Sequence, residues 1–404
     1  MRLPGRSYHL AGMASTPYDR RPVADPSELG LDAEALDALF ARVQVDVDAG
    51  RLPSCQLALA RDGRVAVWRA FGTKSGRAAP VESRYVMFSA TKAVVAGAMW
   101  ILMGEGLVDV TLPVAAVIPE FAANGKDTIT IEQVMLHTSG FPRAPFHALD
   151  WDDRERRLAR FSQWRCNWEP GTRFEYHPTS AHWVLAEIIE RCTVGDFRVF
   201  IRERIIDPLG LVGMQIGVPA EQQGDINDLM LTGEHATPEE LEAAIGVRSL
   251  PLTEVTPDAL MSFNRPEIRA VGVPGGGGVT TAADLALYYQ ALLNDPVGIL
   301  KPEVLADVTA NVRNRLPDYL GAPANRTLGL VIAGDDGKAS VRGMGHTVSP
   351  RAFGHNGAGG QIAWADPDTG LSFCYLTNGL DQHEIRQARR TTGIASRAAN
   401  CVAS

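Results

Sequence analysis

A chain of 404 residues, with 45% hydrophobic and 21% charged residues, has the size and composition of a globular protein with a large core. The net charge of −8, together with the lack of a basic stripe with interleaved aromatic residues, argues against nucleic acid as a partner. The five cysteines form no C-x-x-C pair, and neither a signal-peptide run nor a membrane-length apolar run is present, so we expect reduced thiols and a cytoplasmic protein.

The first third of the chain predicts a helix, a hairpin and a buried helix. Apolar residues at i, i+3, i+4 and i+7 predict a helix over residues 31–50. Residues 54–72 have the pattern of two strands joined by an Asp62-Gly63 turn. The stretch "MFSATKAVVAGAMWILMGEG", which begins at Met87, is apolar on every side and predicts a buried helix.

Helical patterns dominate from Leu107 to Arg269, most clearly over residues 129–140 and 180–192. Four glycines at 275–278 predict a tight turn and precede another helix, "TAADLALYYQALLN". Two strand-like stretches, "TLGLVIAGD" and "GGQIAWADPDTGLSFCYLTNG", follow it, and a final helix is expected to start near Gln382.

This order predicts an α+β fold, in which strands from both ends of the chain form one antiparallel sheet flanked by helices. The middle of the chain is then a mainly helical insertion. The expected organisation is a poorly ordered tail over residues 1–28, an α/β sheet domain from residues 29–106 and 271–404, and a helical domain over residues 107–270.

Ser89 and Lys92 stand at positions i and i+3 of the buried helix, so the hydroxyl and the amine lie on one face and can meet. Burial lowers the pKa of a lysine, and its neutral amine can accept the serine proton. This is the arrangement of an activated nucleophile. The alternative is an ordinary N-cap serine next to a lysine that extends to solvent.

The chain resembles the serine β-lactamase-like hydrolases, a group that includes class C β-lactamases, DD-peptidases and family VIII carboxylesterases. The likeness runs from about Leu31 to Gly379 and is strongest to the last of these. It is carried, in this order, by "SATK", "GEGLVDVTLPVAAVIPEF", "ITIEQVMLHTSGFP", "WEPGTRFEYHPTSAHWVLAEIIE", "IIDPLGLVGMQIGVP" and "GGGGVTTAADLALYYQALLN". The resemblance implies the β-lactamase/transpeptidase-like fold, with the site between the sheet and the helical insertion.

The resemblance places Tyr176 at the tyrosine of the family's Y-x-N motif, where a phenolate beside Lys92 takes the serine proton and returns it to the leaving group. Without the order of the motifs along the chain, the sequence would favour a core tyrosine whose hydroxyl is hydrogen-bonded within the protein. Pro178 stands where the family has asparagine, whose amide helps to hold a substrate amide. This departure disfavours β-lactam and peptide turnover, whereas simple esters need no such contact.

His355-Asn356-Gly357 resembles the family's K-T-G box in its H-x-G form, on a strand that lines the site. Because imidazole titrates near 6.5, we expect His355 to be a weak partner for a substrate carboxylate at pH 7 and to become charged towards pH 6. By the same alignment, the backbone N–H groups of Ser89 and Ala358 form the oxyanion hole. The alternative for this stretch is a plain glycine-rich strand edge.

Other parts of the sequence carry weaker expectations. His137 in "HTSG" is expected to cap a helix or to order a loop near the site. No H-x-x-x-H, H-E-x-x-H or G-x-S-x-G spacing exists, so neither a metal site nor an α/β-hydrolase nucleophile is expected. The segment from Arg143 to Asn167, rich in aromatic residues and arginines, is expected to border the cleft and shape acyl choice, or else to be a surface helix with a packed aromatic face.

The resemblance and the residues together predict a serine carboxylesterase that hydrolyses short- to medium-chain esters through an acyl-enzyme, with Ser89, Lys92 and Tyr176 as its catalytic centre. No cofactor is implied. The expected partner is a small-molecule ester, without nucleic acid or membrane, and a homo-oligomer is compatible with the sequence. Three alternatives stay open: a β-lactamase or D-amino peptidase-like amidase, an acyltransferase, and a catalytically silent penicillin-binding-like sensor.

Overall fold

The fold is built on a seven-stranded sheet whose neighbouring strands are all antiparallel. The computed structural model describes residues 18, 23–250 and 255–403. The strand order is β3 (Arg77–Ala78), β2 (Arg64–Lys74), β1 (Ser54–Arg61), β11 (Leu371–Thr377), β10 (Ile362–Asp366), β9 (Phe353–Gly354) and β8 (Val331–Ile332). Strands from both ends of the chain therefore share one sheet, as predicted.

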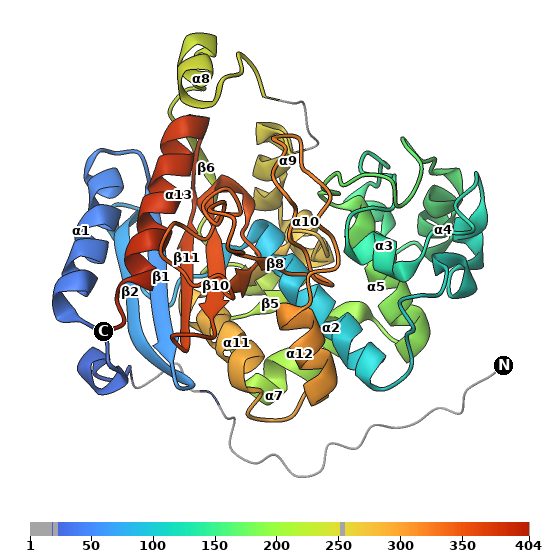
Figure 1. The fold of residues 1–404 in the computed structure, drawn as a ribbon, viewed down its shortest axis with the longest axis horizontal. Helices are drawn as coiled ribbons and strands as arrows, with labels where there is room; N and C mark the ends of the chain where they lie inside the picture. The colour runs from blue at the N-terminus through green and yellow to red at the C-terminus, as the bar shows by residue number, and fades with distance from the viewer. Residues whose placement is uncertain (1–17, 19–22, 251–254, 404) are drawn as a thin grey trace.

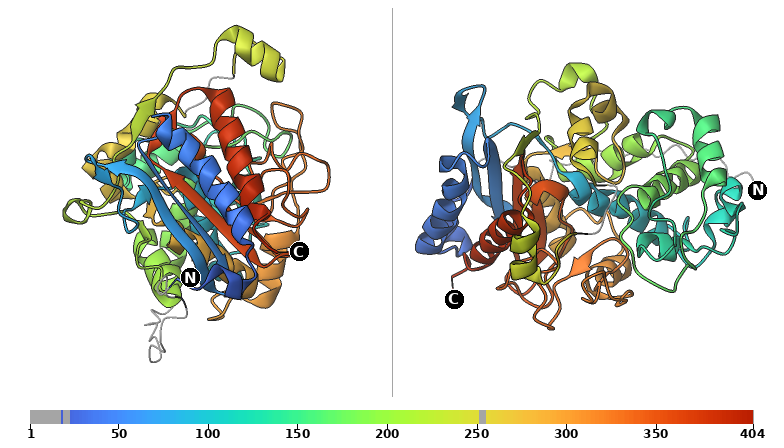
Figure 2. Two further views of the ribbon diagram at one scale, coloured as in Figure 1. Left: turned by 90° about the vertical axis from the view of Figure 1, so that its left-hand side faces the viewer. Right: turned by 90° about the horizontal axis from the view of Figure 1, so that it is seen from above.

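Side chains of alternate strand residues point to opposite faces of this sheet. Leu57 and Leu59 of β1 pack with α1 (Ala33–Asp48) and α13 (Glu384–Ala399) on one face, whereas Ala58 and Ala60 belong to the larger core on the other. That second face is covered by α11 (Ala282–Asn294). Figure 2 shows α1 and α13 side by side in front of the strands. The predicted hairpin turn is confirmed, since Asp62 and Gly63 both have positive φ.

The helices between Gly104 and Gly272 gather on the other side of α2 (Thr91–Gly104) from the sheet, and α2 runs through the middle of the molecule (Figure 1). They are α3 (Ile131–Met135), α4 (Arg154–Gln163), α5 (Ser180–Thr193), α6 (Phe197–Ile201), a π-helical turn (Arg202–Ile206), α7 (Asp207–Leu209), α8 (Pro238–Ile245), α9 (Pro257–Met261) and α10 (Pro266–Val271). After α11, the chain adds α12 (Pro302–Ala310) before it returns to the sheet. The α+β fold with a mainly helical insertion is thus confirmed.

Two small sheets interrupt the helical middle, and sequence periodicity did not predict them. β4 (Tyr85–Val86), β7 (Gly278–Thr280) and β5 (Gln215–Ile216) form one, and β6 (Met230–Thr232) pairs in parallel with β12 (Gly379–Asp381) in the other. Strands of two or three residues are too short to show an alternating pattern. The β4–β7 pair matters for function, because it brings the glycine run at 275–278 beside the segment that precedes Ser89.

The predicted tail over residues 1–28 lies largely outside the described residues, which omit 1–17 and 19–22. Within it, Tyr18 is buried, and Pro26–Leu29 forms a 3-10 helix capped by Asp25. The boundaries expected for the two domains stay a prediction. All five cysteines are free thiols, as expected from their spacing. No helix among the described residues is long and apolar enough to cross a membrane.

Candidate active site

Ser89 sits in a 3-10 turn (Phe88–Ala90) between β4 and the buried helix α2. Phe88, the residue before it, has a φ of 44°, which is rare for a residue with a large side chain. Such a conformation persists only when its surroundings hold it, and it is typical of functional sites. Phe88 is held by an apolar cluster, described below, and the Ser89 side chain is left half-exposed at the start of α2.

Lys92 is fully buried, and its amine donates to three oxygens. Nζ lies 3.2 Å from Ser89 Oγ, 2.7 Å from the Pro178 carbonyl oxygen and 2.5 Å from the Gly275 carbonyl oxygen. Burial lowers the pKa of Lys92, which makes its neutral, proton-accepting form more accessible near neutral pH. The predicted meeting of hydroxyl and amine is therefore confirmed, and the Lys92 side chain does not extend to solvent.

The glycine run after α10 provides the floor beneath Lys92. A Cβ on Gly275 would stand only 2.8 Å from the Pro178 carbonyl oxygen and 3.5 Å from Lys92 Nζ. Gly276 and Gly277 both donate their backbone N–H groups to the Val273 carbonyl, so the run forms the tight turn that was predicted. Glycine is needed here because backbone approaches backbone with no space for a side chain.

Tyr176 faces Lys92 across the site, with Lys92 Nζ 5.0 Å from the centroid of its ring. Its hydroxyl oxygen is buried, and its interaction with the Lys92 amine offsets part of the lowering of the Lys92 pKa by burial. The Tyr176 side chain as a whole is half-buried, so it is not fully enclosed in the core. Its predicted role in proton transfer stays a prediction.

Buried histidines hold the loop that carries Tyr176. His177 Nε2 accepts from the Phe141 N–H at 3.2 Å and lies 3.1 Å from Ser139 Oγ, and its Nδ1 donates to the Glu175 carbonyl at 2.6 Å. The backbone N–H of His177 donates to His137 Nδ1 at 3.1 Å, so His137 orders the loop, as predicted. Burial lowers the pKa of His177 to about 3 and keeps both rings neutral.

The H-x-G box follows β9, in the turn that leads to β10. A Cβ on Gly357 would overlap the Met87 carbonyl oxygen, so this turn runs directly beside the segment before Ser89. The Asn356 amide donates to the Gly343 carbonyl at 2.6 Å and accepts from the Ala363 N–H at 3.0 Å. Because both ends of this amide are used inside the protein, Asn356 shapes the turn, and these bonds give its predicted contact with substrate no support.

The turn also supplies backbone donors opposite Ser89. Neither the Ser89 N–H nor the Ala358 N–H donates to another described residue. Two unpaired N–H groups at half-exposed positions suit an oxyanion that forms during attack on a carbonyl. Their use as an oxyanion hole stays a prediction.

Arg326 is the feature of the site that sequence reasoning missed. Its guanidinium carbon lies 5.2 Å from the ring centroid of Tyr176 and 5.4 Å from that of Phe174, and its Nη1 lies 3.5 Å from His355 Nε2. No aspartate or glutamate among the described residues lies within ion-pair distance of it. Arg326 precedes β8 in a loop without a motif. The only sequence signal was an arginine with no acidic neighbour in "GAPANRTLGL".

Arg326 corrects the expectation for His355. Burial, with Arg326 and Lys92 nearby, holds the pKa of His355 well below its usual value, so lowering the pH to 6 does not charge this ring. A permanent cation stands beside it instead. We call Arg326, together with the basic residue Lys92, the cationic wall of the site, in which Arg326 supplies the fixed charge. The prediction that the site has only a weak positive charge is therefore wrong. The site has a permanent positive charge, and this charge comes from Arg326, which lies outside the H-x-G box.

The segment from Arg143 to Asn167 does not supply a row of exposed aromatic side chains. Trp151, Phe161 and Trp164 are buried. Phe161 packs on Trp164 and on Phe146, and Trp151 packs on Phe146 and on Trp183 of α5. The second of the two expectations, a helix with a packed aromatic face, is the one the structure supports. These residues stabilise the helical insertion, and selectivity for the acyl group has to be sought elsewhere.

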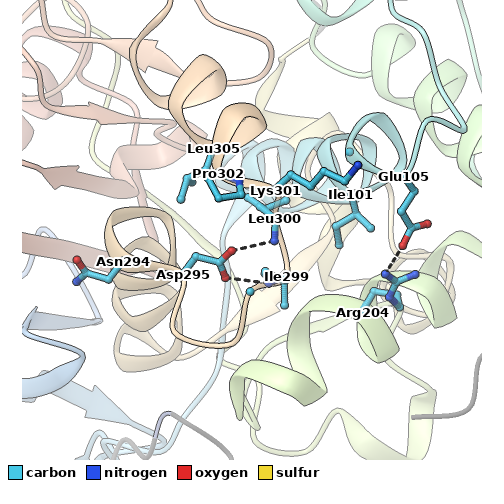
Figure 3. Close-up of a pocket in the computed structure, with 12 residues that line it drawn as sticks. Ile101, Glu105, Arg204, Asn294, Asp295, Ile299, Leu300, Lys301, Pro302 and Leu305 are labelled. Atoms are coloured by element: carbon cyan, nitrogen blue, oxygen red, sulfur yellow. Dashed lines mark hydrogen bonds and ion pairs between the residues drawn. The ribbon is translucent and has the colours of Figure 1, made fainter. Parts of the chain in front are cut away.

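An open pocket of about 610 Å³ lies at the opposite end of α2, away from Ser89 (Figure 3). Its lining includes Lys301, Asp295 and the Arg204–Glu105 ion pair, in which Nη2 and Oε1 are 2.5 Å apart. It contains none of the predicted site residues. Among the described residues, no group of three His, Cys, Asp or Glu side chains is placed to hold a metal ion.

Comparison with known proteins identifies the family to which the chain belongs. The Beta-lactamase family model matches residues 39–396. The Esterase/beta-lactamase LipL of Mycobacterium tuberculosis is 30% identical over 347 residues, which cover 80% of this chain and 76% of that protein. A penicillin-binding protein homologue from Caulobacter crescentus is 26% identical, with a TM-score of 0.72 over 91% of this chain and 99% of its own.

A family VIII carboxylesterase of known structure has the same TM-score of 0.72 at 25% identity, over 91% of this chain and 99% of its own. The matched region contains every residue of the site described above. The family match and the two solved structures thus agree with the observed fold. The chain belongs to the Beta-lactamase family and is a hydrolase of the β-lactamase fold.

Proposed function

We propose that this chain is a serine carboxylesterase that hydrolyses short- to medium-chain esters. The observation that carries the proposal is the contact of 3.2 Å between Ser89 Oγ and the buried amine of Lys92, whose pKa is lowered by burial. A serine within hydrogen-bond reach of a base is the arrangement of an activated nucleophile. The names of LipL and of the family VIII carboxylesterase support ester hydrolysis on this fold.

The chemistry follows from the groups around Ser89. Its Oγ attacks the ester carbonyl carbon while its proton passes to Lys92 or Tyr176. The N–H groups of Ser89 and Ala358 donate to the oxyanion, and collapse of the tetrahedral intermediate expels the alcohol, which takes the proton back. Water then repeats the sequence on the acyl-enzyme. The product is a carboxylic acid, and Ser89 is regenerated.

Pro178, which stands where the family has asparagine, favours esters over β-lactams as substrates. Proline has no side-chain amide to bond a substrate amide, and its carbonyl oxygen already accepts from Lys92. One missing hydrogen bond is worth about 1.5 kcal/mol, or roughly tenfold in kcat/KM. We therefore expect kcat/KM for p-nitrophenyl butyrate to exceed that for a chromogenic cephalosporin by at least about tenfold at pH 7.

The test is both measurements on one enzyme preparation, with Ser89→Ala as the matched control. Loss of both activities in the alanine variant would assign them to this site. Comparable kcat/KM values for the two substrates would contradict the ester preference and favour a β-lactamase.

Arg326 favours a second candidate, a hydrolase for substrates that carry a carboxylate, such as β-lactams or D-amino peptides. A half-buried guanidinium beside Tyr176 without an acidic partner among the described residues suits a carboxylate that arrives with the substrate. LipL is named both an esterase and a β-lactamase.

An acyltransferase differs only in using an alcohol instead of water on the acyl-enzyme. Adding an alcohol during turnover and measuring the transfer product separates it from a hydrolase. A cytoplasmic location and a homo-oligomer stay predictions from the sequence.

A further inference from the structure

Ser89 has an apolar neighbourhood around the preceding residue, Phe88. Its centre is a buried cluster, to which Phe88 and Leu380 belong and against which Ala358 packs. The Phe88 ring meets the Phe263 ring edge-on, with centroids 5.5 Å apart. A Cβ on Gly359 would stand 3.8 Å from the Phe88 ring, so this ring lies beside the turn that carries Ala358.

Three apolar side chains of one segment extend this cluster towards solvent. Leu260 and Met261 of α9, and Phe263 of the 3-10 turn that follows (Ser262–Asn264), pack against the cluster but are only half-buried. We call these three residues the apolar wall. Phe263 reaches the site floor, because its ring lies 3.6 Å from the position of a Cβ on Gly276. Figures 1 and 2 show α9 and α10 on the side of the molecule near the start of α2.

The wall is fixed at its C-terminal end. Arg269, which is buried, donates to the Phe263 carbonyl at 2.7 Å and to Asn264 Oδ1 at 3.1 Å. The Asn264 side chain also exchanges two hydrogen bonds with the backbone of Leu229. These bonds hold Phe263 in register with Phe88. Leu260 and Met261 lie one turn further from this anchor.

We propose that the apolar wall binds the acyl chain of the ester while its carbonyl carbon is bonded to Ser89. The proposal rests on the proposed function and names its substrate class: esters of linear, uncharged acids long enough to reach Leu260 and Met261. The argument is one of position and charge. The wall adjoins Ser89 through Phe88 and Ala358, and all its side chains are hydrocarbon or thioether. Half-buried apolar side chains gain burial when an acyl chain covers them.

The size of the effect follows from the area covered. Each methylene removed from water strengthens binding by about fourfold. The kcat/KM for p-nitrophenyl esters should therefore rise from acetate towards octanoate and then level off beyond the wall. Replacing Leu260 or Met261 by alanine should lower the octanoate-to-acetate ratio of kcat/KM by about fivefold or more.

The experiment measures that ratio over acetate, butyrate, hexanoate and octanoate for Leu260→Ala, Met261→Ala and the conservative Met261→Leu. Leu112→Ala is the matched control, because Leu112 is a partly exposed leucine away from the site. A fall of the ratio in the two alanine variants, with Met261→Leu and Leu112→Ala close to wild type, supports the proposal. Met261→Leu conserves volume and shows that the effect needs loss of side-chain volume. If an alanine variant unfolds, the chain-length series on the wild-type protein still tests the proposal, because kcat/KM that does not rise from acetate to octanoate would overturn it.

Equal losses on all chain lengths, or an unchanged ratio, would overturn the proposal while leaving the esterase intact. A wild-type protein that hydrolyses no ester and is not labelled by a fluorophosphonate would overturn the proposed function itself. The two failures are therefore distinguishable in one set of measurements.

Discussion

The two walls that meet at Ser89 differ in chemistry and in origin. The cationic wall places Lys92 and Arg326 around Tyr176, in an interior where several buried histidines stay neutral. The apolar wall comes from α9 and the turn after it, and presents hydrocarbon beside Ala358. The two walls therefore have different expected roles. The cationic wall supplies proton transfer and a fixed charge, and the apolar wall supplies surface for an uncharged acyl chain.

The largest effect is expected from breaking the proton transfer on the cationic side. Lys92→Met and Tyr176→Phe should each lower kcat for ester hydrolysis by about a thousandfold. Because both serve one step, the double variant should lose little more than either single variant. The measurement is kcat and KM for p-nitrophenyl butyrate on all four proteins. Losses that multiply would show that the two residues act in separate steps.

The next effect concerns the charge of Arg326. Arg326→Gln should lower kcat/KM for a half-ester such as p-nitrophenyl hydrogen adipate by roughly ten- to a hundredfold, because a charge-assisted hydrogen bond is lost. For p-nitrophenyl hexanoate, which has no carboxylate, the loss should be much smaller. Arg326→Lys should recover part of the difference. Equal losses on both esters would show that Arg326 only supports Tyr176.

A smaller effect is expected on stability. Burial keeps the pKa of His137, His177, His182 and His355 below that of the unfolded chain, so the unfolded state binds more protons below about pH 6.5. Folding stability should therefore fall as the pH drops, by about 1.4 kcal/mol per pH unit for each histidine that stays neutral.

Urea unfolding at pH 7.5, 6 and 5 measures this slope. His182 is the clearest probe, because neither of its ring nitrogens has a partner among the described residues. His182→Gln should flatten the slope, and the exposed His147→Gln should not. The same dependence of unfolding free energy on pH in all three proteins would contradict the assignment of part of this slope to His182.

The last prediction is that the ratio of two activities stays nearly constant with pH. His355 stays neutral beside Arg326, so the ratio of cephalosporin to ester turnover should change by less than about twofold between pH 7.5 and 6. A ratio that rises steeply towards pH 6 would show that His355 gains a proton and binds the substrate carboxylate itself.

The sequence predicted one wall better than the other. Ser89 and Lys92 are one helical turn apart, and their contact follows from local geometry alone. Tyr176 and Ala358 were found through the order of motifs along the chain. Arg326 was not found, because its proximity to Tyr176 depends on a loop of irregular structure before β8, and such a path has no periodic signal.

The sequence left the aromatic residues of the helical insertion undecided. Trp151, Phe161 and Trp164 were expected either to border the cleft or to form the packed face of a surface helix, and the structure supports the second. Composition does not distinguish a buried aromatic side chain from one that lines a site, because both are apolar. The sequence gives no signal for Leu260 and Met261, because short helices with scattered apolar residues look alike in sequence.

The most direct test of the central claim, that Ser89 is the nucleophile of this hydrolase, is covalent labelling. The protein is treated with a fluorophosphonate, digested, and mapped by mass spectrometry, with ester hydrolysis measured in parallel. We expect one label on the peptide that contains Ser89, with loss of activity in proportion, and neither label nor activity in Ser89→Ala. A label on another residue, or an alanine variant that keeps more than about a hundredth of kcat, would contradict the account.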